Sequence, residues 1–404
     1  MYAACVWAPA TKKIGVQRKL NAVQRGFAQK LCKAYRTVSL NSALVLAGIL
    51  PLDLRIQETA ALYEAKRGVS QPGLGDGEIE RKTAYTDTPH PANHKAKQFI
   101  CLEDRQQVET QSTQAVQIYT DGSKIDGKVG AALTLWSNAA EIKNRKLKLP
   151  SYCTVYQAEL LAICKATEEA LSRRETSFGI FSDSRSSLET VANTYALHPL
   201  AVQTRKNIEE CTTRGKEVQL FWIKAHAGLE GNERADQLAK DAAQNLKTRP
   251  YYDKCPVSFI KRKIRADTLD EWNRRYSEGS TAAVTKMFLP DARVAYKIVK
   301  KVEFSGIMTQ IFTGHGGFSS YLNRFGLRES PSCICDPVNE ETVAHILIDC
   351  PIYGRKRYEC EQMIDTQICR ENIYKIIENR KIRDIFLSFC LEVAQNVINR
   401  NKDI

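Results

Sequence analysis

The chain has 404 residues, a hydrophobic content of 43% and a formal net charge of +13. The length suggests two or three domains, and the absence of any run of about 18 apolar residues excludes an ordinary membrane-spanning helix. The start lacks the charged-then-apolar order of a secretion signal, so we expect an intracellular protein, nuclear or cytoplasmic, with mostly reduced cysteines. The positive charge favours a polyanionic partner, above all nucleic acid.

The first 68 residues are predicted to be helical and basic. Residues 1–40 contain eight Lys and Arg and no Asp or Glu. Four apolar residues recur there at helical spacing: Leu20, Val23, Phe27 and Leu31. They predict an amphipathic basic helix over 16–35, followed by short helices over 43–47, capped by Ser39, and over 53–67. The basic helix is expected either to contact a nucleic-acid backbone or to be a solvated surface of a helix that packs elsewhere.

Residues 69–113 are rich in Gly, Pro and polar residues without a clear period, which predicts a linker with surface-exposed His90 and His94. The next region, 114–246, is the most regular part of the chain. Strands are predicted over 116–120, 129–136, 141–149, 178–182 and 218–223, and helices over 154–173, 184–193, 200–214 and 232–246. This order predicts an α/β domain with a mixed five-stranded sheet and helices on its faces.

Four carboxylates fall at comparable places in these elements. Asp121 is expected at the end of the first strand, Glu159 early in the long helix, Asp183 at the end of the fourth strand and Asp236 early in the last helix. Strand ends and helix starts meet at one edge of such a sheet, where ligands bind. Crowded carboxylates repel one another unless cations lie between them, and oxygen ligands suit Mg²⁺ or Mn²⁺.

Two such ions about 4 Å apart activate a water and stabilise the leaving oxygen of a phosphodiester. His226, in a glycine-bearing loop before Asp236, is suited to act as a proton shuttle. Each acid alone is more often structural, since an Asp such as Asp121 is common in turns. The complete set at these positions instead indicates a metal-dependent nuclease.

The motifs around these residues resemble the type 1 ribonuclease H family. They read Ile-Tyr-Thr-Asp-Gly-Ser at 118–123, Tyr-Gln-Ala-Glu-Leu at 156–160, Phe-Ser-Asp-Ser at 181–184 and Trp-Ile-Lys-Ala-His-Ala-Gly-Leu-Glu-Gly-Asn-Glu-Arg-Ala-Asp at 222–236. The resemblance implies a ribonuclease H-like fold and hydrolysis of the RNA strand of RNA–DNA hybrids with two Mg²⁺ ions. It also implies that Asp121 bridges both ions, that Glu159 and Asp183 complete one site and Asp236 the other, and that His226 is the family's mobile histidine.

The resemblance also implies two substrate contacts, and the sequence departs from the family pattern in two places. Ser123 and Gln157, which flank two of the proposed ligands, are expected to contact the hybrid. Two departures stand out: Lys-Ala-His at 224–226 replaces the more common Pro-Gly-His, and residues 184–217 leave room for only two helices. The basic extra helix of some cellular members is therefore expected to be absent, so that hybrid binding depends on other Lys and Arg residues.

The flanking segment resembles a narrower family. Val-Gln-Arg-Gly-Phe-Ala at 23–28, Ala-Tyr-Arg-Thr at 34–37 and Leu-Ala-Gly-Ile-Leu-Pro-Leu at 46–52 are similar to the tail of the reverse transcriptase in non-LTR retrotransposons of the R1/Jockey-like type. The resemblance implies a C-terminal piece of a longer polyprotein, with 1–68 as the reverse transcriptase tail and a reverse transcriptase domain as partner. The polymerase's own Asp motifs do not occur, so no polymerase activity is expected.

Residues 247–404 are predicted to be an α-rich region with a Cys/His motif. Cys333-Ile-Cys335, nine residues, His345, four residues and Cys350 could supply three sulfurs and one nitrogen to a structural Zn²⁺. The tight Cys-x-Cys spacing leaves open that these are unconnected thiols and a surface histidine. Retrotransposon polyproteins of this type end in a comparable segment, which favours zinc. Residues 371–400 are predicted to be helical, and Cys360, Cys369 and Cys390 to be packing residues.

Three functions compete on this basis. The first is the metal-dependent endonuclease acting on RNA–DNA hybrids. The second is a non-catalytic nucleic-acid-binding remnant of a retroelement, favoured by the missing polymerase, the net charge and the Cys/His motif. The third, an integrase- or resolvase-like nuclease of the same fold, ranks lower because those enzymes lack the His-Ala-Gly-Leu-Glu-Gly-Asn-Glu-Arg-Ala-Asp motif.

Overall fold

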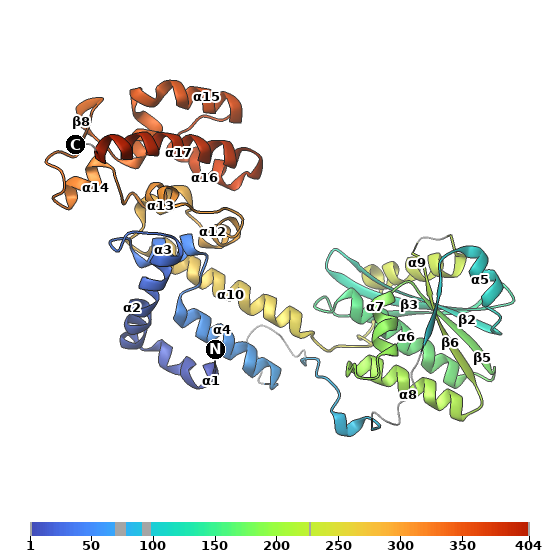
Figure 1. Ribbon diagram of the computed structural model, residues 1–404. Coiled ribbons are helices and arrows are strands. Elements are labelled where there is room, and N and C mark those ends of the chain that lie inside the picture. Colours follow the sequence, from blue (N-terminus) through green and yellow to red (C-terminus); the bar gives the residue numbers. More distant parts are fainter. Residues whose placement is uncertain (1, 69–77, 91–97, 226–227, 403–404) are drawn as a thin grey trace. The chain divides into compact units, whose positions relative to one another are not determined.

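The computed structural model describes residues 2–68, 78–90, 98–225 and 228–402. The chain divides into two compact units (Figure 1). Glu64–Lys261 form the sheet unit, while Met1–Tyr63 and Arg262–Ile404 together form the helical unit.

The sheet unit is built on a six-stranded mixed sheet with the order β1-β6-β5-β2-β3-β4. Its strands are β1 (Phe99–Leu102), β2 (Val116–Ile125), β3 (Lys128–Ser137), β4 (Ala140–Leu149), β5 (Ser177–Ser182) and β6 (Glu217–Ile223). β2, β3 and β4 pair antiparallel, while β2, β5, β6 and β1 pair parallel. The predicted α/β class and mixed sheet are confirmed, with one strand more than the five expected.

Helices cover both faces of this sheet. They are α5 (Arg105–Gln111), α6 (Val155–Ser172), α7 (Arg185–Ala192), α8 (Pro199–Thr213) and α9 (Glu230–Asn245). Alternate residues of a strand face opposite sides. In β2, Gly122 lies against α6, whereas Tyr119 lies against Gly231 at the start of α9, so these two helices cover opposite faces. Only α7 and α8 lie between β5 and β6, as the sequence predicted.

The first strand is longer than predicted, which changes the position of Asp121. β2 continues through Asp121, Gly122 and Ser123, and Asp121 pairs with Ala132 of β3. The turn is made instead by Asp126 and Gly127, whose φ angles are 49° and 78°. Asp-Gly with both residues at positive φ suits a two-residue hairpin turn. The expected strand end at Asp121 is therefore wrong, and this residue lies inside the central strand.

Part of the predicted linker is regular structure. β1 pairs with β6 and α5 follows it, although both lie within 69–113. Farther upstream, Ile79 forms a parallel bridge with Cys255, and Glu80 accepts hydrogen bonds from Tyr252 and Gln157. A four-residue strand is too short for an alternating pattern to identify it, and only the neighbouring β6 makes it a strand. His90 is exposed, and His94 lies outside the described residues.

The helical unit combines both ends of the chain around one core. Its N-terminal helices are α1 (Ala4–Trp7), α2 (Ile14–Leu31), α3 (Leu40–Ala47) and α4 (Leu52–Lys66), the last of which crosses the unit boundary. The later elements are α10 (Val257–Glu278), α11 (Ala283–Phe288), α12 (Ala292–Ile298), α13 (Gly306–Thr313), α14 (Ser319–Arg324), β7 (Ser332–Cys333), β8 (Asp336–Glu340), α15 (Gly354–Ile364), α16 (Arg370–Glu378) and α17 (Arg380–Lys402). The shared core contains Leu44 of α3, Phe312 of α13 and Phe386 of α17. The two flanks, predicted as separate regions, thus fold together.

The apolar stripe of α2 faces outward rather than into this core. Val23, Phe27 and Leu31 are 60%, 66% and 64% exposed, while Gln24 and Gln29 are buried. The buried glutamines hold the segments before and after α3, because the Gln24 amide donates to the Leu50 carbonyl and the Gln29 amide to the Arg36 and Val38 carbonyls. Helical periodicity located the helix, but the apolar residues that define it are not its buried side.

The C-terminal helix predicted over 371–400 is interrupted once. α16 and α17 are separated by Asn379, whose side-chain oxygen accepts a hydrogen bond from the backbone amide of Lys381. The apolar residues of both helices, including Ile376 and Phe389, are buried in the core of the helical unit.

Among the described residues, no single helix has the length and apolarity needed to cross a membrane. One pair, α3 with α4, passes that test only jointly and is bent by 53°. Five consecutive residues of α3, from Ser42 to Leu46, are buried within the helical unit.

Candidate metal centres

Four predicted acidic ligands line one pocket in the sheet unit. This acid pocket has a volume of about 230 Å³ and is lined by Asp121, Gly122, Glu159, Asp183, Asn232, Glu233 and Asp236. One carboxylate oxygen from each of Asp121, Glu159 and Asp183 lies within 4.8 Å of the others. Asp236 lines the same pocket but does not belong to that tighter group.

The sheet register explains why these acids meet. Thr120 of β2 is paired with Ser182 of β5, so Asp121 and Asp183 follow at the same level of two neighbouring parallel strands. Glu159 lies near the start of α6, where the Thr154 side chain accepts a hydrogen bond from the Gln157 amide and the Gln157 side chain accepts one from the Thr154 amide. This capping box fixes the first turn of α6 and thereby the position of Glu159.

Gly122 is required for the same arrangement. A Cβ at this position would lie 2.6 Å from the backbone nitrogen of Glu159 and 3.0 Å from the carbonyl carbon of Ala158. β2 and α6 thus approach backbone to backbone, which places Glu159 beside Asp121. Only glycine allows this distance without moving the helix.

The electrostatics of the acid pocket favour a bound cation. Asp121 and Glu159 are only 7% and 6% exposed, and within the described residues Asp121 Oδ2 and Glu159 Oε2 have no hydrogen-bond partner. Burial, followed by repulsion from Asp183 and Asp236, raises the pKa of Asp121 to about 7. Burial and the neighbouring Asp121 and Asp183 also raise the pKa of Glu159 well above its usual value.

Buried oxygens without partners are costly, and a divalent cation would satisfy them. The donors are all oxygens, as Mg²⁺ and Mn²⁺ prefer. The residues present therefore fit the divalent ions that the sequence predicted.

Asn232 and Glu233 line the pocket, although neither was predicted as a site residue. Asn232 is 5% exposed, and its Oδ1 has no partner in the described part of the chain. It precedes Asp236 by four residues on α9, so both side chains lie on one side of that helix. This spacing is visible in the sequence and would have identified Asn232.

The other predicted site residues are placed differently. Ser123 is partly exposed on β2 beyond Asp121. Gln157 is 1% exposed, and its side-chain amide donates to Glu80 and to the Lys254 carbonyl, so its polar atoms are used inside the unit. The predicted contact of Gln157 with a hybrid would require this buried side chain to leave Glu80 and the Lys254 carbonyl, two partners that the local motif does not reveal. His226 lies outside the described residues.

The Cys/His motif forms a second cluster, in the helical unit. One donor atom from each of Cys333, Cys335, His345 and Cys350 lies within 4.8 Å of the others. The sulfurs of Cys333 and Cys350 are 3.9 Å apart, and Cys335 Sγ is 3.2 Å from His345 Nε2. Two thiolates on a tetrahedral Zn²⁺ are separated by about 3.8 Å, given Zn–S bonds of about 2.3 Å. The three sulfurs and one nitrogen therefore fit a zinc ion.

The three cysteines that were predicted to be packing residues lie outside this cluster. Cys360 and Cys390 are buried in the core of the helical unit, and Cys369 is partly exposed. All 13 cysteines are free thiols. The burial of Cys360 and Cys390 agrees with their predicted packing role, whereas Cys369, which precedes α16, is not part of that core.

Comparison with known proteins separates the chain into a matched domain and its flanks. Residues 113–244 match the family model described as RNase H. Ribonuclease H1 of Rattus norvegicus is 26% identical over 145 residues, a match that covers 32% of this chain and 51% of that protein. The RNase H1 structure from Halobacterium salinarum is 23% identical and covers 32% of this chain and 98% of that one, with a TM-score of 0.27.

A second group of relatives extends the similarity beyond this domain. The retrovirus-related Pol polyprotein from type-1 retrotransposable element R1 of Popillia japonica is 24% identical over 241 residues, covering 57% of this chain and 91% of that sequence. The R1 polyprotein of Bradysia coprophila is 30% identical over 96 residues, but the match covers only 9% of its length. The chain thus spans a small part of some curated relatives and nearly all of another.

Proposed function

We propose that residues 113–244, which belong to the ribonuclease H family, hydrolyse the RNA strand of RNA–DNA hybrids. The observation that carries this proposal is the group of Asp121, Glu159 and Asp183, with two buried carboxylate oxygens that lack partners among the described residues. Similarity to ribonuclease H1 supports the same activity.

Two divalent ions, Mg²⁺ or Mn²⁺, are proposed as cofactors. Asp121, Glu159 and Asp183 would hold one ion, and Asp236 with Asp121 the other. When bound, the ions would lower the pKa of the attacking water and stabilise the leaving oxygen of the phosphodiester. Asn232 would add a neutral oxygen to the pocket through Oδ1.

The chain's own groups prepare this site in three ways. Burial of Asp121 and Glu159 makes their charged forms dependent on a neighbouring cation. Lys240 donates to Asp236 Oδ2 at 2.6 Å, which holds that carboxylate in place. His226 is proposed to carry a proton to the departing oxygen, and Ser123 to contact the hybrid backbone.

Cleavage of a labelled hybrid by the full chain tests the proposal. With Mg²⁺ present, we expect the RNA strand to be cut, and Asp121→Asn to lower the rate at least about a thousandfold, because it removes the carboxylate shared by both ions. Asp126→Asn is the matched control, because it alters a carboxyl group in the adjacent hairpin turn at a positive φ that Asn tolerates.

The outcome separates the two leading functions. Cleavage by Asp121→Asn at the wild-type rate would refute the assigned site. Tight binding of the hybrid without any cleavage by the wild-type chain would instead favour the non-catalytic nucleic-acid-binding function.

We also propose that the Cys/His cluster binds one structural Zn²⁺. The compact donor set and the 3.9 Å separation of the Cys333 and Cys350 sulfurs support it. Elemental analysis of the reduced protein should find about one zinc per chain. Cys335→Ser should remove it, whereas Cys369→Ser, at a partly exposed cysteine outside the cluster, should not. Zinc-free protein that keeps its fold would exclude this site.

The similarity to R1 polyproteins supports a further proposal about context. It covers 57% of this chain in one relative, well beyond the matched domain. We infer that the chain works beside a reverse transcriptase domain, inside the cell.

A further inference from the structure

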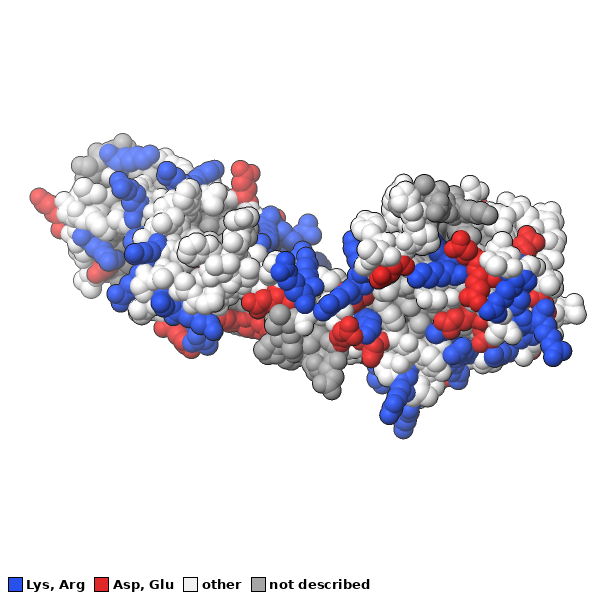
Figure 2. Space-filling view, turned by 90° about the horizontal axis from the view of Figure 1, so that it is seen from below, with Lys and Arg blue, Asp and Glu red and all other residues white. Residues whose placement is uncertain are grey.

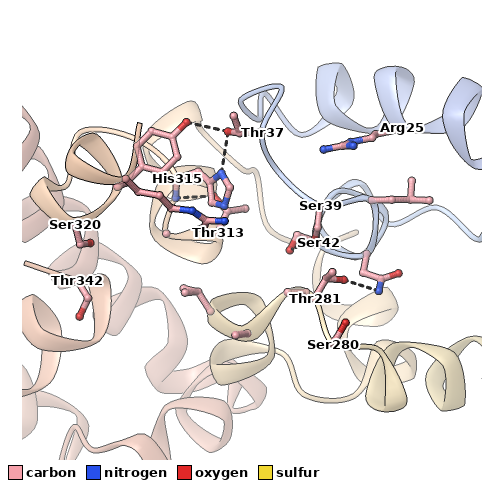
Figure 3. A pocket seen from close by; sticks show the side chains of 18 of the residues that line it. Arg25, Thr37, Ser39, Ser42, Ser280, Thr281, Thr313, His315, Ser320 and Thr342 are labelled. Atoms are coloured by element: carbon pink, nitrogen blue, oxygen red, sulfur yellow. Dashed lines mark hydrogen bonds between the residues drawn. The ribbon is translucent and has the colours of Figure 1, made fainter. Parts of the chain in front are cut away.

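A large pocket of the helical unit shares no lining residue with either metal centre. This hydroxyl pocket has a volume of about 770 Å³. Its walls carry hydroxyl groups from both ends of the chain, including Thr37, Ser39, Thr281, Ser320 and Thr342. Figure 3 shows Thr37 and Ser39 on the segment that leads into α3, and Thr281, Ser320 and Thr342 on the C-terminal half. The pocket therefore depends on the shared fold of the two flanks.

Hydrogen bonds between Thr37, His315 and Tyr321 connect the two sides of the pocket. Thr37 Oγ1 lies 2.9 Å from His315 Nδ1 and 2.8 Å from the Tyr321 hydroxyl (Figure 3). Burial and the nearby Arg324 lower the pKa of His315, so its ring is neutral at neutral pH. The polar wall is thus preorganised and offers neutral donors and acceptors.

The charged residues of the pocket make it a site for anions. Arg25 and Arg324 line it, against a single carboxylate, Glu340. Arg324 is exposed and lies with its guanidinium 5.8 Å from the ring centroid of Phe325. Two arginines surrounded by hydroxyl groups suit a phosphodiester backbone, because both groups donate hydrogen bonds to phosphate oxygens.

Aromatic rings continue from the edge of the pocket. The centroids of Tyr35 and Tyr321 are 6.2 Å apart, and those of Tyr321 and Phe325 are 4.8 Å apart. Tyr35 and Phe325 are 48% and 44% exposed, although each contacts this cluster. Exposed rings beside a basic polar groove can stack unpaired bases, whereas the bases of a duplex are already stacked on one another.

The charge of the helical unit agrees with such a ligand. Residues 1–63 hold nine Lys and Arg against two Asp and Glu, and residues 262–404 hold 22 against 19, so this unit carries +10 of the net +13. On the face shown in Figure 2, basic side chains are spread out rather than gathered in one block. Diffuse charge attracts a nucleic acid, while the pocket supplies a defined place for it.

We propose that the hydroxyl pocket and the Tyr35–Tyr321–Phe325 rings bind a single-stranded nucleic acid, with the backbone in the pocket and unpaired bases on the rings. Single-stranded RNA and single-stranded DNA both offer what this site would recognise: a phosphodiester backbone and unpaired bases that are available for stacking. This binding site belongs to the helical unit and does not depend on hydrolysis in the acid pocket.

Fluorescence anisotropy of the full chain with labelled 12-nucleotide oligo(U), oligo(dT) and a 12-base-pair duplex tests the proposal, without added Mg²⁺. Both single strands, or one of them, should bind more tightly than the duplex. Tyr35→Ala and Arg324→Gln should each weaken single-strand binding about fivefold or more, as expected for loss of a stacking ring or a phosphate contact. The ratio of oligo(U) to oligo(dT) affinity tells which single strand is preferred.

Matched controls lie on α15 of the same unit, outside the pocket. Tyr358 is 61% exposed and Arg355 is exposed, so Tyr358→Ala and Arg355→Gln remove the same groups elsewhere. The proposal fails if the duplex binds as tightly as the single strands, or if control and pocket variants weaken binding equally. Hybrid cleavage by Tyr35→Ala and Arg324→Gln, measured in parallel, keeps this result separate from the proposed nuclease activity.

Discussion

At the residue scale, Asp121 is held in an environment that disfavours its charge. It lies inside β2, is almost fully buried and faces Asp183 and Asp236. An ordinary aspartate in a turn would titrate near pH 4, but burial and these neighbours raise the pKa of Asp121 to about 7. The charged form of Asp121 thus lowers the free energy of unfolding at the place where we propose that a cation binds.

This raised pKa predicts how stability depends on pH in the absence of divalent ions. The folded protein keeps a proton on Asp121 that the unfolded chain releases from about pH 4, so the free energy of unfolding should fall as pH rises from about 4 to 7. Each unit of pKa difference corresponds to about 1.4 kcal/mol. Asp121→Asn should therefore melt above the wild type at pH 8 and close to it at pH 4.

Thermal unfolding in buffer that contains a chelator of divalent ions, measured from pH 4 to pH 8, would test this effect. Added Mg²⁺ at pH 8 should raise the melting temperature of the wild type more than that of Asp121→Asn, because ligand binding stabilises the folded state. The repulsion argument would be contradicted if the melting temperatures of the two proteins changed with pH in parallel. It would also be contradicted if Asp121→Asn melted far below the wild type at pH 8.

At the element scale, the site depends on how closely β2 and α6 approach. The distance is set by the missing side chain of Gly122, against which the backbone of Glu159 and Ala158 packs. The motif at 118–123 marks Gly122 only as the residue that follows the proposed ligand Asp121. Its contact with α6 could not be read from the motif, because it joins residues 37 positions apart.

Gly122→Ala should therefore separate β2 from α6. We expect a loss of about 1–3 kcal/mol in stability, as for other overpacked sites, together with a weaker stabilisation by Mg²⁺ because Glu159 is displaced. Chemical denaturation with and without Mg²⁺ measures both effects. Gly26→Ala serves as the control, since a Cβ there meets nothing within 4 Å and should not destabilise α2.

The helix α2 shows the limit of periodicity at this scale. Its position followed from the spacing of Leu20, Val23, Phe27 and Leu31, and the structure has α2 over Ile14–Leu31. The buried side nevertheless carries Gln24 and Gln29, whose amides donate to backbone carbonyls before and after α3. The buried side thus combines the core residue Ala28 with two glutamines that bind backbone outside the helix, a combination that apolar spacing alone does not predict.

At the scale of the whole molecule, the two candidate metal centres lie in different units. The acid pocket belongs to the sheet unit and the Cys/His cluster to the helical unit. Each unit has its own core, and the core of the helical unit includes Cys333 and Cys350. Each metal should therefore stabilise its own unit.

Selective metal removal tests this separation. A zinc chelator that leaves Mg²⁺ bound should lower the melting temperature of the helical unit and leave that of the sheet unit unchanged, because structural zinc contributes directly to folding. Removal of Mg²⁺ should instead lower the melting temperature of the sheet unit and leave that of the helical unit unchanged. Calorimetry of the full chain, with Cys335→Ser as a zinc-free reference, measures both transitions. A single transition that shifts with either metal would show that the units unfold together.

Local sequence patterns were enough to locate most elements of the sheet unit and four of the five acids that line its pocket. Strand alternation, helical spacing and caps such as Thr154 are local, so they placed β2 to β6 and α6 to α9 within a few residues. Three features emerged only in the folded chain: Asp121 lies inside a strand, β1 is a strand and Gln157 is buried. Folding also joined both ends of the chain in one core and thereby formed the hydroxyl pocket. The physical reason is that pairing, burial and shared cores depend on residues far apart in the chain, which no local pattern records.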